Sequence, residues 1–525
     1  AYASTGTLVS GDRGTYSDTS TQSKNTYADA IATLNKSFND WSVNVNLGVS
    51  LSDSRYEMIG YEGGLKLINF FAVHNIDFNK AWKAKQSGWH DQTRAIFANA
   101  EIGWKSMIYL TATGRNDWDS RLAFSDYKSF FYPSIGLSAI LTSMFNAPDW
   151  LTYLKVRGSY TEVGNSYGRF MTTVTYPYDE QTQSWTSTSS YPNTKLKPER
   201  TKSWEVGLDA RILNDISLNL TYYRSNTYNQ TFYADLSLSS GYSNIPIQSG
   251  NIMNEGLEMS LGYNKQWKDF SFNTNYTLTW NKNRVKRLAD GVYNYATGQP
   301  IQMPELSPLT YGHTDARLIL RVGGSMGDVY GQRLLKRDLN GYILNEEGVG
   351  LAMENKETYL GSILPKMNMG WSLGFGYKGV NLGMTFTGRF GGIVISETQS
   401  VLDAAGVSKV SADVRDAGGV QINQSKVSAQ TYYQTIQGTA AYYTYSATNV
   451  RLGELSLSYT LPKKWFDNKV GMTVGLVGKN LWMIYCKAPF DPELTTSAAS
   501  NFYQGFDAYM LPSTRNFGFN VKFQF

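Results

Sequence analysis

The end of the chain, residues 516–525, alternates apolar and polar residues without a break. Its apolar members are Phe517, Phe519, Val521, Phe523 and Phe525. Side chains of an extended chain point to alternate faces, so this stretch forms a strand with one oily and one polar face. In a soluble protein, an exposed strand edge with an apolar face promotes aggregation. In an outer-membrane barrel the apolar face contacts lipid, and the backbone groups of the strand edge hydrogen-bond to a neighbouring strand. The stretch therefore predicts a transmembrane β-barrel.

The same period of two recurs about fifteen times. In the segment from Trp204 to Ile212, Glu205, Asp209 and Arg211 all lie opposite the apolar face. A slip of one residue would turn Arg211 into lipid, at a cost of about 2–4 kcal/mol near the midplane. The sequence thus predicts an all-β, large antiparallel barrel whose apolar faces meet lipid. The strands are expected near residues 25–38, 41–51, 96–104, 108–112, 135–141, 154–160, 204–212, 218–222, 257–263, 270–280, 367–377, 380–386, 455–461, 470–476 and 517–525.

The connections between these segments alternate between short and long. Short periplasmic turns and long outer loops are typical of bacterial barrels, so the long connections are expected to be extracellular. They lie near residues 54–90, 118–128, 165–199, 230–252, 286–365, 391–447 and 483–512. Residues 1–23 are polar and are expected to form a loop or the remnant of a strand. Because about fifteen strands is not an even number, we expect the remaining strands to lie upstream or in another chain.

Composition supports a barrel rather than a helical membrane protein. The apolar share is 42% and the mean hydropathy is −0.35, which is too polar for a bundle of membrane helices. Tyr (37), Trp (13) and Gly (48) are abundant, as expected for aromatic girdles and many turns. The net charge of +5 is spread along the chain, which gives no support to nucleic-acid binding. No export signal is visible at Ala1, so we expect a longer precursor.

Several short motifs occur in a fixed order. Residues 196–201 read LKPERT and are followed by EVGLD at 205–209, and residues 254–258 read NEGLE before NKN at 281–283 with Val285. This series resembles the signatures of the SusC-like branch of the TonB-dependent outer-membrane transporters. Further matches are residues 132–134, 322–331 (VG to YG), 338–341 (DLNG), 364–366 (LPK), 451–452, 459–462, 480–481, 491–493 (DPE), Pro512 and Arg515.

This resemblance implies more than the strand pattern does. It implies a 22-stranded barrel closed by an amino-terminal plug, of which this chain would supply about 15 strands and no plug. It further implies energy from the TonB-ExbB-ExbD motor through the missing part, a SusD-like surface lipoprotein as partner, and a glycan or peptide as substrate. The residue pattern alone leaves open a passive diffusion porin or a barrel that serves as a scaffold.

Candidate sites for chemistry are few. His74, His90 and His313 fall in expected outer loops without partners at metal-ligand spacing, and no G-x-S-x-G or HExxH motif occurs. The single cysteine, Cys486, excludes an internal disulfide. We therefore expect no catalytic, metal or cofactor residues, and no enzyme.

Loop aromatics are the candidates for binding a substrate or a lid protein. Aromatic rings beside amide and hydroxyl groups suit polar organic ligands such as sugars, although such rings more often pack loops together. The candidates are Trp185, Tyr191, Tyr503, Phe506 and Tyr509. Inward-facing polar residues, with scattered charges, predict a lumen that suits neutral solutes or that contacts a plug. These charges are Lys155, Arg157, Arg211, Arg389 and Glu454.

Overall fold

A computed structural model describes most of the chain. The described residues are 13–80, 82–176, 178–179, 184–186, 188–248, 250–288, 292–293, 298–301, 305–346, 350–467, 469–494, 496–497 and 501–525. Their dominant element is one antiparallel sheet of 15 strands that follow one another in chain order. This sheet confirms the predicted fold class and the predicted strand series. Its strands are β1 (Thr15–Phe38), β2 (Trp41–Gly64), β3 (Trp82–Trp104), β4 (Ile108–Asp119), β5 (Phe130–Ile140), β6 (Leu151–Asn165), β9 (Glu199–Ile212), β10 (Ile216–Tyr228), β13 (Asn251–Trp267), β14 (Phe270–Arg287), β23 (Met367–Tyr377), β24 (Val380–Phe390), β29 (Asn449–Thr460), β30 (Gly471–Cys486) and β32 (Asn516–Gln524).

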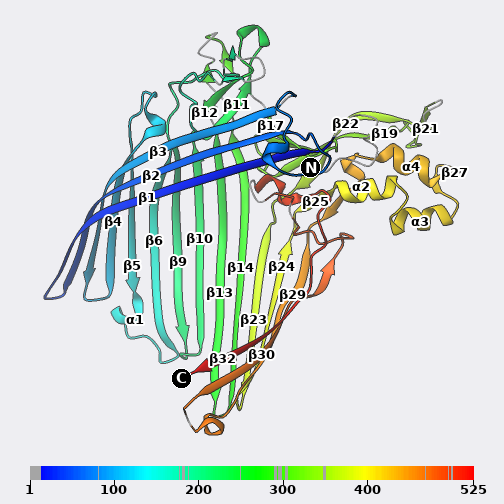
Figure 1. Ribbon diagram of the computed structural model, residues 1–525. Coiled ribbons are helices and arrows are strands. Elements are labelled where there is room, and N and C mark those ends of the chain that lie inside the picture. The colour runs from blue at the N-terminus through cyan, green and yellow to red at the C-terminus, as the bar shows by residue number, and fades with distance from the viewer. Residues whose placement is uncertain are drawn as a thin grey trace.

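The sheet forms a curved wall with two different ends (Figure 1). Short turns join strands at one end, and several of them contain residues with positive φ, as tight hairpins require. At the turn between β23 and β24, for example, Lys378 has φ 46° and Gly379 has φ 91°. The long connections gather at the other end. Within the described residues, β1 pairs only with β2 and β32 only with β30, so both are edges of the sheet.

Two sequence-based boundaries change in the structure. Of residues 1–23, which were expected to form a loop or the remnant of a strand, residues 15–23 belong to β1 and residues 1–12 lie outside the described residues. The expected loop at 54–90 is reduced to residues 65–81, because β2 continues to Gly64 and β3 begins at Trp82. These extensions carry charged residues on both faces, so the apolar alternation ends before the hydrogen-bonded strand does.

The long connections fold into small sheets and helices of their own. Among the described residues, none of the helices is long and apolar enough to cross a membrane. The long connections contain α2 (Glu397–Ala404), α3 (Lys409–Asp416) and α4 (Ala429–Ile436), whereas α1 (Leu141–Met144) lies in the short connection between β5 and β6. The additional strands are β7 (Tyr178–Asp179), β8 (Ser184–Trp185), β11 (Thr231–Asp235), β12 (Asn244–Gln248), β15 (Val292–Tyr293), β16 (Pro300–Ile301), β17 (Glu305–Thr310), β18 (Arg317–Arg321), β19 (Asp328–Leu335), β20 (Asn345–Glu346), β21 (Gly350–Leu351), β22 (Met353–Ser362), β25 (Ile393–Ser396), β26 (Val420–Ile422), β27 (Ser425–Val427), β28 (Thr444–Ser446) and β31 (Phe506–Asp507).

The apolar face of the large sheet is not buried against other protein. Trp204 is 41% exposed, Phe519 69% and Phe523 54%. Leu208 is half-buried between its strand neighbours. Instead, the largest buried core lies among the long connections, where Tyr311, Leu318, Val329 and Ile395 are inaccessible to solvent. The strands therefore present an oily surface outward, and the compact core belongs to the loops.

Candidate functional site

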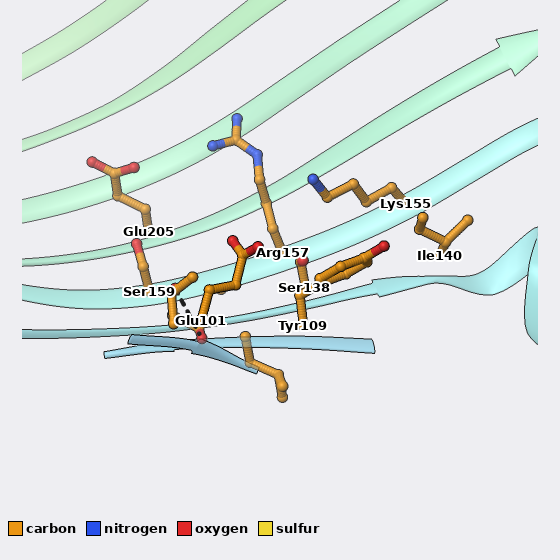
Figure 2. Close-up of a pocket in the computed structure, with 12 residues that line it drawn as sticks. Glu101, Tyr109, Ser138, Ile140, Lys155, Arg157, Ser159 and Glu205 are labelled. Carbon is orange, nitrogen blue, oxygen red and sulfur yellow. Dashed lines mark hydrogen bonds between the residues drawn. The ribbon is translucent and has the colours of Figure 1, made fainter. Parts of the chain in front are cut away.

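The polar face of the sheet holds a cluster of charged residues. Lys155 and Arg157 on β6, Glu101 on β3 and Glu205 on β9 project from neighbouring strands toward a shared cavity of about 520 Å³ (Figure 2). Each lies one residue away from an outward apolar residue, so the alternation that makes the oily face also places these charges inside. Tyr109, Thr111, Ser138 and Ser159 complete the polar part of the lining.

Arg157 is the best-connected member of this cluster. Its Nη2 donates a hydrogen bond to Thr221 Oγ1 at 2.7 Å, and its Nε lies 3.7 Å from Asp209 Oδ2. Asn219 also donates to the Asp209 carboxylate. Because charges of both signs and several hydroxyl groups face one space, this wall can hydrogen-bond a polar solute or a polypeptide segment.

The charges expected in the lumen have different surroundings. Arg389 is half-buried and donates from Nη2 to the carbonyl of Ile363 at 2.9 Å. Glu454 lies 3.7 Å from Lys479 Nζ. Glu101 was not singled out from the sequence, although its place between outward Ala100 and Ile102 is the signal that would have found it.

The second candidate region is a loop assembly, which we define as the connections 288–366, 391–448 and 487–515. Buried side chains from all three connections meet in one cluster around Tyr311, so three segments far apart in sequence pack against one another there. A second cluster around Tyr433 joins the first two connections. Tyr311 occupies its centre. The Tyr311 hydroxyl donates to the carbonyl of Phe502 at 2.6 Å, and its ring lies 5.1 Å from the ring of Phe506. Phe506 in turn pairs with Ile395 in a parallel bridge between β31 and β25.

The sequence motifs lie at the joint between this assembly and the strands. Asn283 of the NKN motif accepts a hydrogen bond from the backbone N–H of Met326 at 2.7 Å, and its amide donates to Asn254 at 2.9 Å. Val285 exchanges two backbone hydrogen bonds with Gly323 and Gly324, both at 2.8 Å. The motifs thus fix the loop assembly to β13 and β14.

A buried ion pair makes the second joint. Arg451 at the start of β29 donates to both carboxylate oxygens of Asp491, at 2.9 and 2.8 Å. Their side chains are only 10% and 8% exposed. Asn449, which is fully buried, bonds both Arg451 and Glu493. Burial alone would raise the pKa of Asp491, but the hydrogen bonds from Arg451 hold it below its ordinary value.

This joint is expected to open in acid. A carboxyl group whose pKa is lowered by folding stabilises the folded state above its unfolded pKa of about 3.9, and that stabilisation is lost as the pH falls through the folded value. The protection of residues 487–515 against hydrogen exchange, taken relative to the unfolded chain at each pH, should therefore stay constant from pH 7 to about 5 and fall below about pH 4. A loss of protection already between pH 7 and 5, or none at pH 3, would contradict the role given to Asp491.

The five loop aromatics are not brought together. Trp185 is 71% exposed and packs edge-on against Tyr178, and Tyr509 is 59% exposed with its hydroxyl 3.2 Å from Glu397. Tyr191 is half-buried beside Tyr242, and Tyr503 is half-buried beside Tyr311. Phe506 is 2% exposed, which favours packing for this residue. A ligand-binding role for the exposed Trp185 and Tyr509 stays a prediction.

Histidine, cysteine and acidic side chains do not gather into a metal site in the described parts of the chain. There, no group of three or more His, Cys, Asp or Glu side chains is placed to hold a metal ion. His90 lies 2.7 Å from Asp53 as an exposed pair on β3 and β2. The lumenal wall and the loop assembly are the two candidate regions for contact with a solute.

A wall of antiparallel strands with an outward apolar face, a polar inner face and long loops at one end defines an outer-membrane barrel. The family described as "TonB dependent receptor-like, beta-barrel" matches residues 1–481, and this chain belongs to that family. The predicted membership of the TonB-dependent transporters is thereby confirmed, as is the outer membrane as the location.

Curated relatives agree with this assignment. TonB-dependent receptor P3 of Formosa agariphila is 24% identical over 544 residues, which cover 95% of this chain and 52% of that protein. TonB-dependent receptor SusC of Bacteroides thetaiotaomicron is 25% identical over 243 residues, which cover 45% of this chain and 22% of that protein. The chain thus spans about half the length of relatives such as P3.

A solved structure shares the fold. The RagAB peptide importer in the "open-open" state superposes with a TM-score of 0.76 at 18% identity, over 97% of this chain and 55% of that one. The same importer in its "closed-closed" state gives a TM-score of 0.72. At this identity the likeness concerns the fold.

The facing of the strands predicts unequal effects of a charge at two adjacent positions. Leu261 and Ser260 are neighbours on β13, and Leu261 points outward while Ser260 points to the lumen. Leu261→Arg is expected to lower the free energy of unfolding in lipid by about 2–4 kcal/mol, whereas Ser260→Arg should cost less than about 1 kcal/mol. Urea unfolding of the full-length protein in vesicles measures both. Equal losses would contradict the assigned facing.

Proposed function

We propose that this chain forms the carboxyl-terminal barrel wall of an active importer for a bulky nutrient, an oligosaccharide or a peptide. The family match carries the proposal, because it assigns the barrel to TonB-dependent receptors. In this proposal TonB, ExbB and ExbD supply energy through a plug that the upstream part of the protein provides. A SusD-like lipoprotein on the cell surface captures the substrate.

Features of the structure support import of a bulky solute. The polar wall with Arg157, Glu101 and Glu205 offers hydrogen bonds along the lumen. The loop assembly has its own core and is fixed to the strands at Asn283 and Arg451. A rigid outer rim of this kind suits a lid protein, because a preorganised surface loses little conformational entropy on binding.

The substrate class rests on chemistry and on relatives. Charges of both signs on the lumenal wall suit a peptide backbone with its mixed side chains, and the related structure is named a peptide importer. The exposed rings of Trp185 and Tyr509 suit the C–H face of a sugar. We therefore retain both substrate classes.

Uptake in cells tests the proposal. A host that carries the full-length gene together with a gene for a SusD-like lipoprotein is given labelled oligosaccharides and labelled peptides, with tonB intact or deleted. The proposal expects uptake of one class to fall to background without tonB and to fall strongly without the lipoprotein. Uptake that persists without tonB, together with ion currents through the purified protein in planar bilayers, would instead support the passive porin.

A further inference from the structure

Five basic residues gather on the outward face of the sheet, at its long-loop end. We call them the cationic patch: Arg200, Lys202, Arg224, Lys282 and Arg284. In the register of the sheet, Arg224 lies opposite Trp204 on β9 and opposite Glu255 on β13, and Glu255 lies opposite Lys282 on β14. Directly opposed residues share a face, so the patch is on the same face as the apolar row.

The patch lies just beyond the outward aromatic residues. These aromatic residues are Trp204 on β9 and Tyr222 on β10, whose ring centroids lie 5.3 Å apart, and Trp280 on β14. Aromatic rows of this kind lie where the hydrocarbon ends and the head groups begin. The next outward positions toward the loops carry the basic residues, so the patch is at the level of the head groups of the outer leaflet.

Acidic side chains of the described residues do not balance the charges in the patch. Its acidic neighbours on this face are Glu162, which pairs with Arg200 and Lys202 at 3.1 Å each, and Glu255, which is 3.8 Å from Lys282. Arg224 and Arg284 have no ion-pair partner among the described residues. The side chains of Arg200, Lys202 and Lys282 are 38%, 44% and 48% exposed. Five cations therefore face two carboxylates on an accessible surface.

A cavity adjoins one end of the patch. Lys282 and Arg284 line it together with Lys366, Ser325 and the ring of Tyr359, and its volume is about 490 Å³. The one carboxylate in its lining, that of Asp328, already accepts from the N–H of Ser325 at 2.9 Å and from the hydroxyl of Tyr359 at 3.2 Å. Lys282, Arg284 and Lys366 thus line a space whose single carboxylate among the described residues is already hydrogen-bonded.

We propose that the cationic patch and this cavity bind the phosphate groups of a phosphorylated glycolipid in the outer leaflet. Guanidinium groups bind phosphate through paired hydrogen bonds, and lysines add point charges. The lipid's acyl chains would lie along the apolar face below Trp204 and Trp280. A soluble substrate would instead be met by the lumenal face, which is on the opposite side of the same strands.

The test compares two sets of three lysine or arginine replacements in the full-length protein. The patch variant carries Arg224→Gln, Lys282→Gln and Arg284→Gln. The control variant carries Lys268→Gln, Lys378→Gln and Lys464→Gln, which removes three cations at the opposite, short-turn end. Each protein is titrated in detergent with purified lipid A, with dephosphorylated lipid A and with inorganic phosphate, and binding is measured by native mass spectrometry.

At about 1 kcal/mol for each basic residue near a charged membrane surface, the patch variant should bind lipid A roughly a hundredfold more weakly. The control variant should bind it as the unmodified protein does, and dephosphorylated lipid A should not distinguish the three proteins. Equal lipid A affinity in all three would overturn the proposal. Inorganic phosphate that binds in a patch-dependent way, without lipid A binding, would replace it by a free-anion site. If the triple variant does not assemble, Lys282→Gln and Arg284→Gln are measured singly, with about a fivefold loss expected for each.

Discussion

Replacing Arg451 by methionine is expected to release residues 487–515 from the strands. The substitution removes one partner of a buried ion pair and leaves Asp491 and Glu493 without their shared cation. Breaking a buried pair in this way costs about 3–5 kcal/mol. The measurement is hydrogen exchange of peptides from residues 487–515 in the full-length protein, where the free energy of local opening should fall by that amount.

Two further variants make this result specific. Arg451→Lys keeps the charge but loses the bidentate geometry, so an intermediate loss is expected. Arg415→Met removes an exposed arginine of α3, whose side chain is 62% exposed, and should change the opening free energy by less than about 0.5 kcal/mol. In addition, the acid dependence of exchange should disappear in Arg451→Met, because Asp491 then no longer has its partner. Unchanged protection in Arg451→Met would show that the ion pair does not anchor this loop.

Replacing Tyr311 by alanine is expected to loosen the whole loop assembly. Tyr311 is fully buried where three connections meet, so the change leaves a large cavity among Phe506, Tyr503 and their neighbours. Truncating a buried aromatic side chain costs about 3–5 kcal/mol. Hydrogen exchange should accelerate together in peptides from residues 305–322, 393–396 and 501–510, because these segments share one core.

The conservative change Tyr311→Phe separates the ring from the hydroxyl. It removes only the hydrogen bond to the carbonyl of Phe502 and should cost about 0.5–1.5 kcal/mol. Tyr342→Ala alters a tyrosine of the same assembly that is 48% exposed and should cost less than about 0.5 kcal/mol. Faster exchange in only one of the three segments after Tyr311→Ala would mean that the connections open independently.

The strands of the barrel could be predicted from the sequence because one physical signal determines both their presence and their facing. In the strand from Trp204 to Ile212, a single slip would expose Arg211 to lipid, so the register had only one low-energy solution. The alternation of apolar and polar residues no longer marks a strand where that strand extends beyond the membrane. Residues 54–64 and 82–90 are hydrogen-bonded in β2 and β3 but have no apolar face to reveal it.

The loop assembly could not be predicted in the same way. Its core unites residues such as Leu318, Ile395 and Phe506, whose contacts depend on three separate chain segments meeting. Some local signals were present. Ser396, Ser408 and Ser428 cap α2, α3 and α4 by accepting hydrogen bonds from the N–H groups of Gln399, Ser411 and Thr431, as serine does at helix starts.

In the candidate site, the facing of strand residues could be predicted from the sequence, whereas contacts between distant segments could not. Lys155 and Arg157 were predicted to face the lumen from alternation, and they line the polar cavity there. The partnership of Arg451 with Asp491 was not predicted, since nothing in the intervening residues indicates that the start of β29 meets a loop after β30. For Phe506, aromatic character alone could not distinguish a ligand contact from a packing role.

The lipid-facing barrel wall is tested most directly by measuring the environment of consecutive side chains on one strand in the native membrane. Single cysteines are placed at positions 257–263 of β13 in a full-length Cys486→Ser background, and an attached probe reports quenching by a lipid-soluble and by a water-soluble agent. The account predicts strict alternation, with positions 257, 259, 261 and 263 quenched from lipid and positions 258, 260 and 262 from water. Quenching of both sets from water, or loss of the alternation, would contradict a lipid-facing barrel wall and with it the proposed importer.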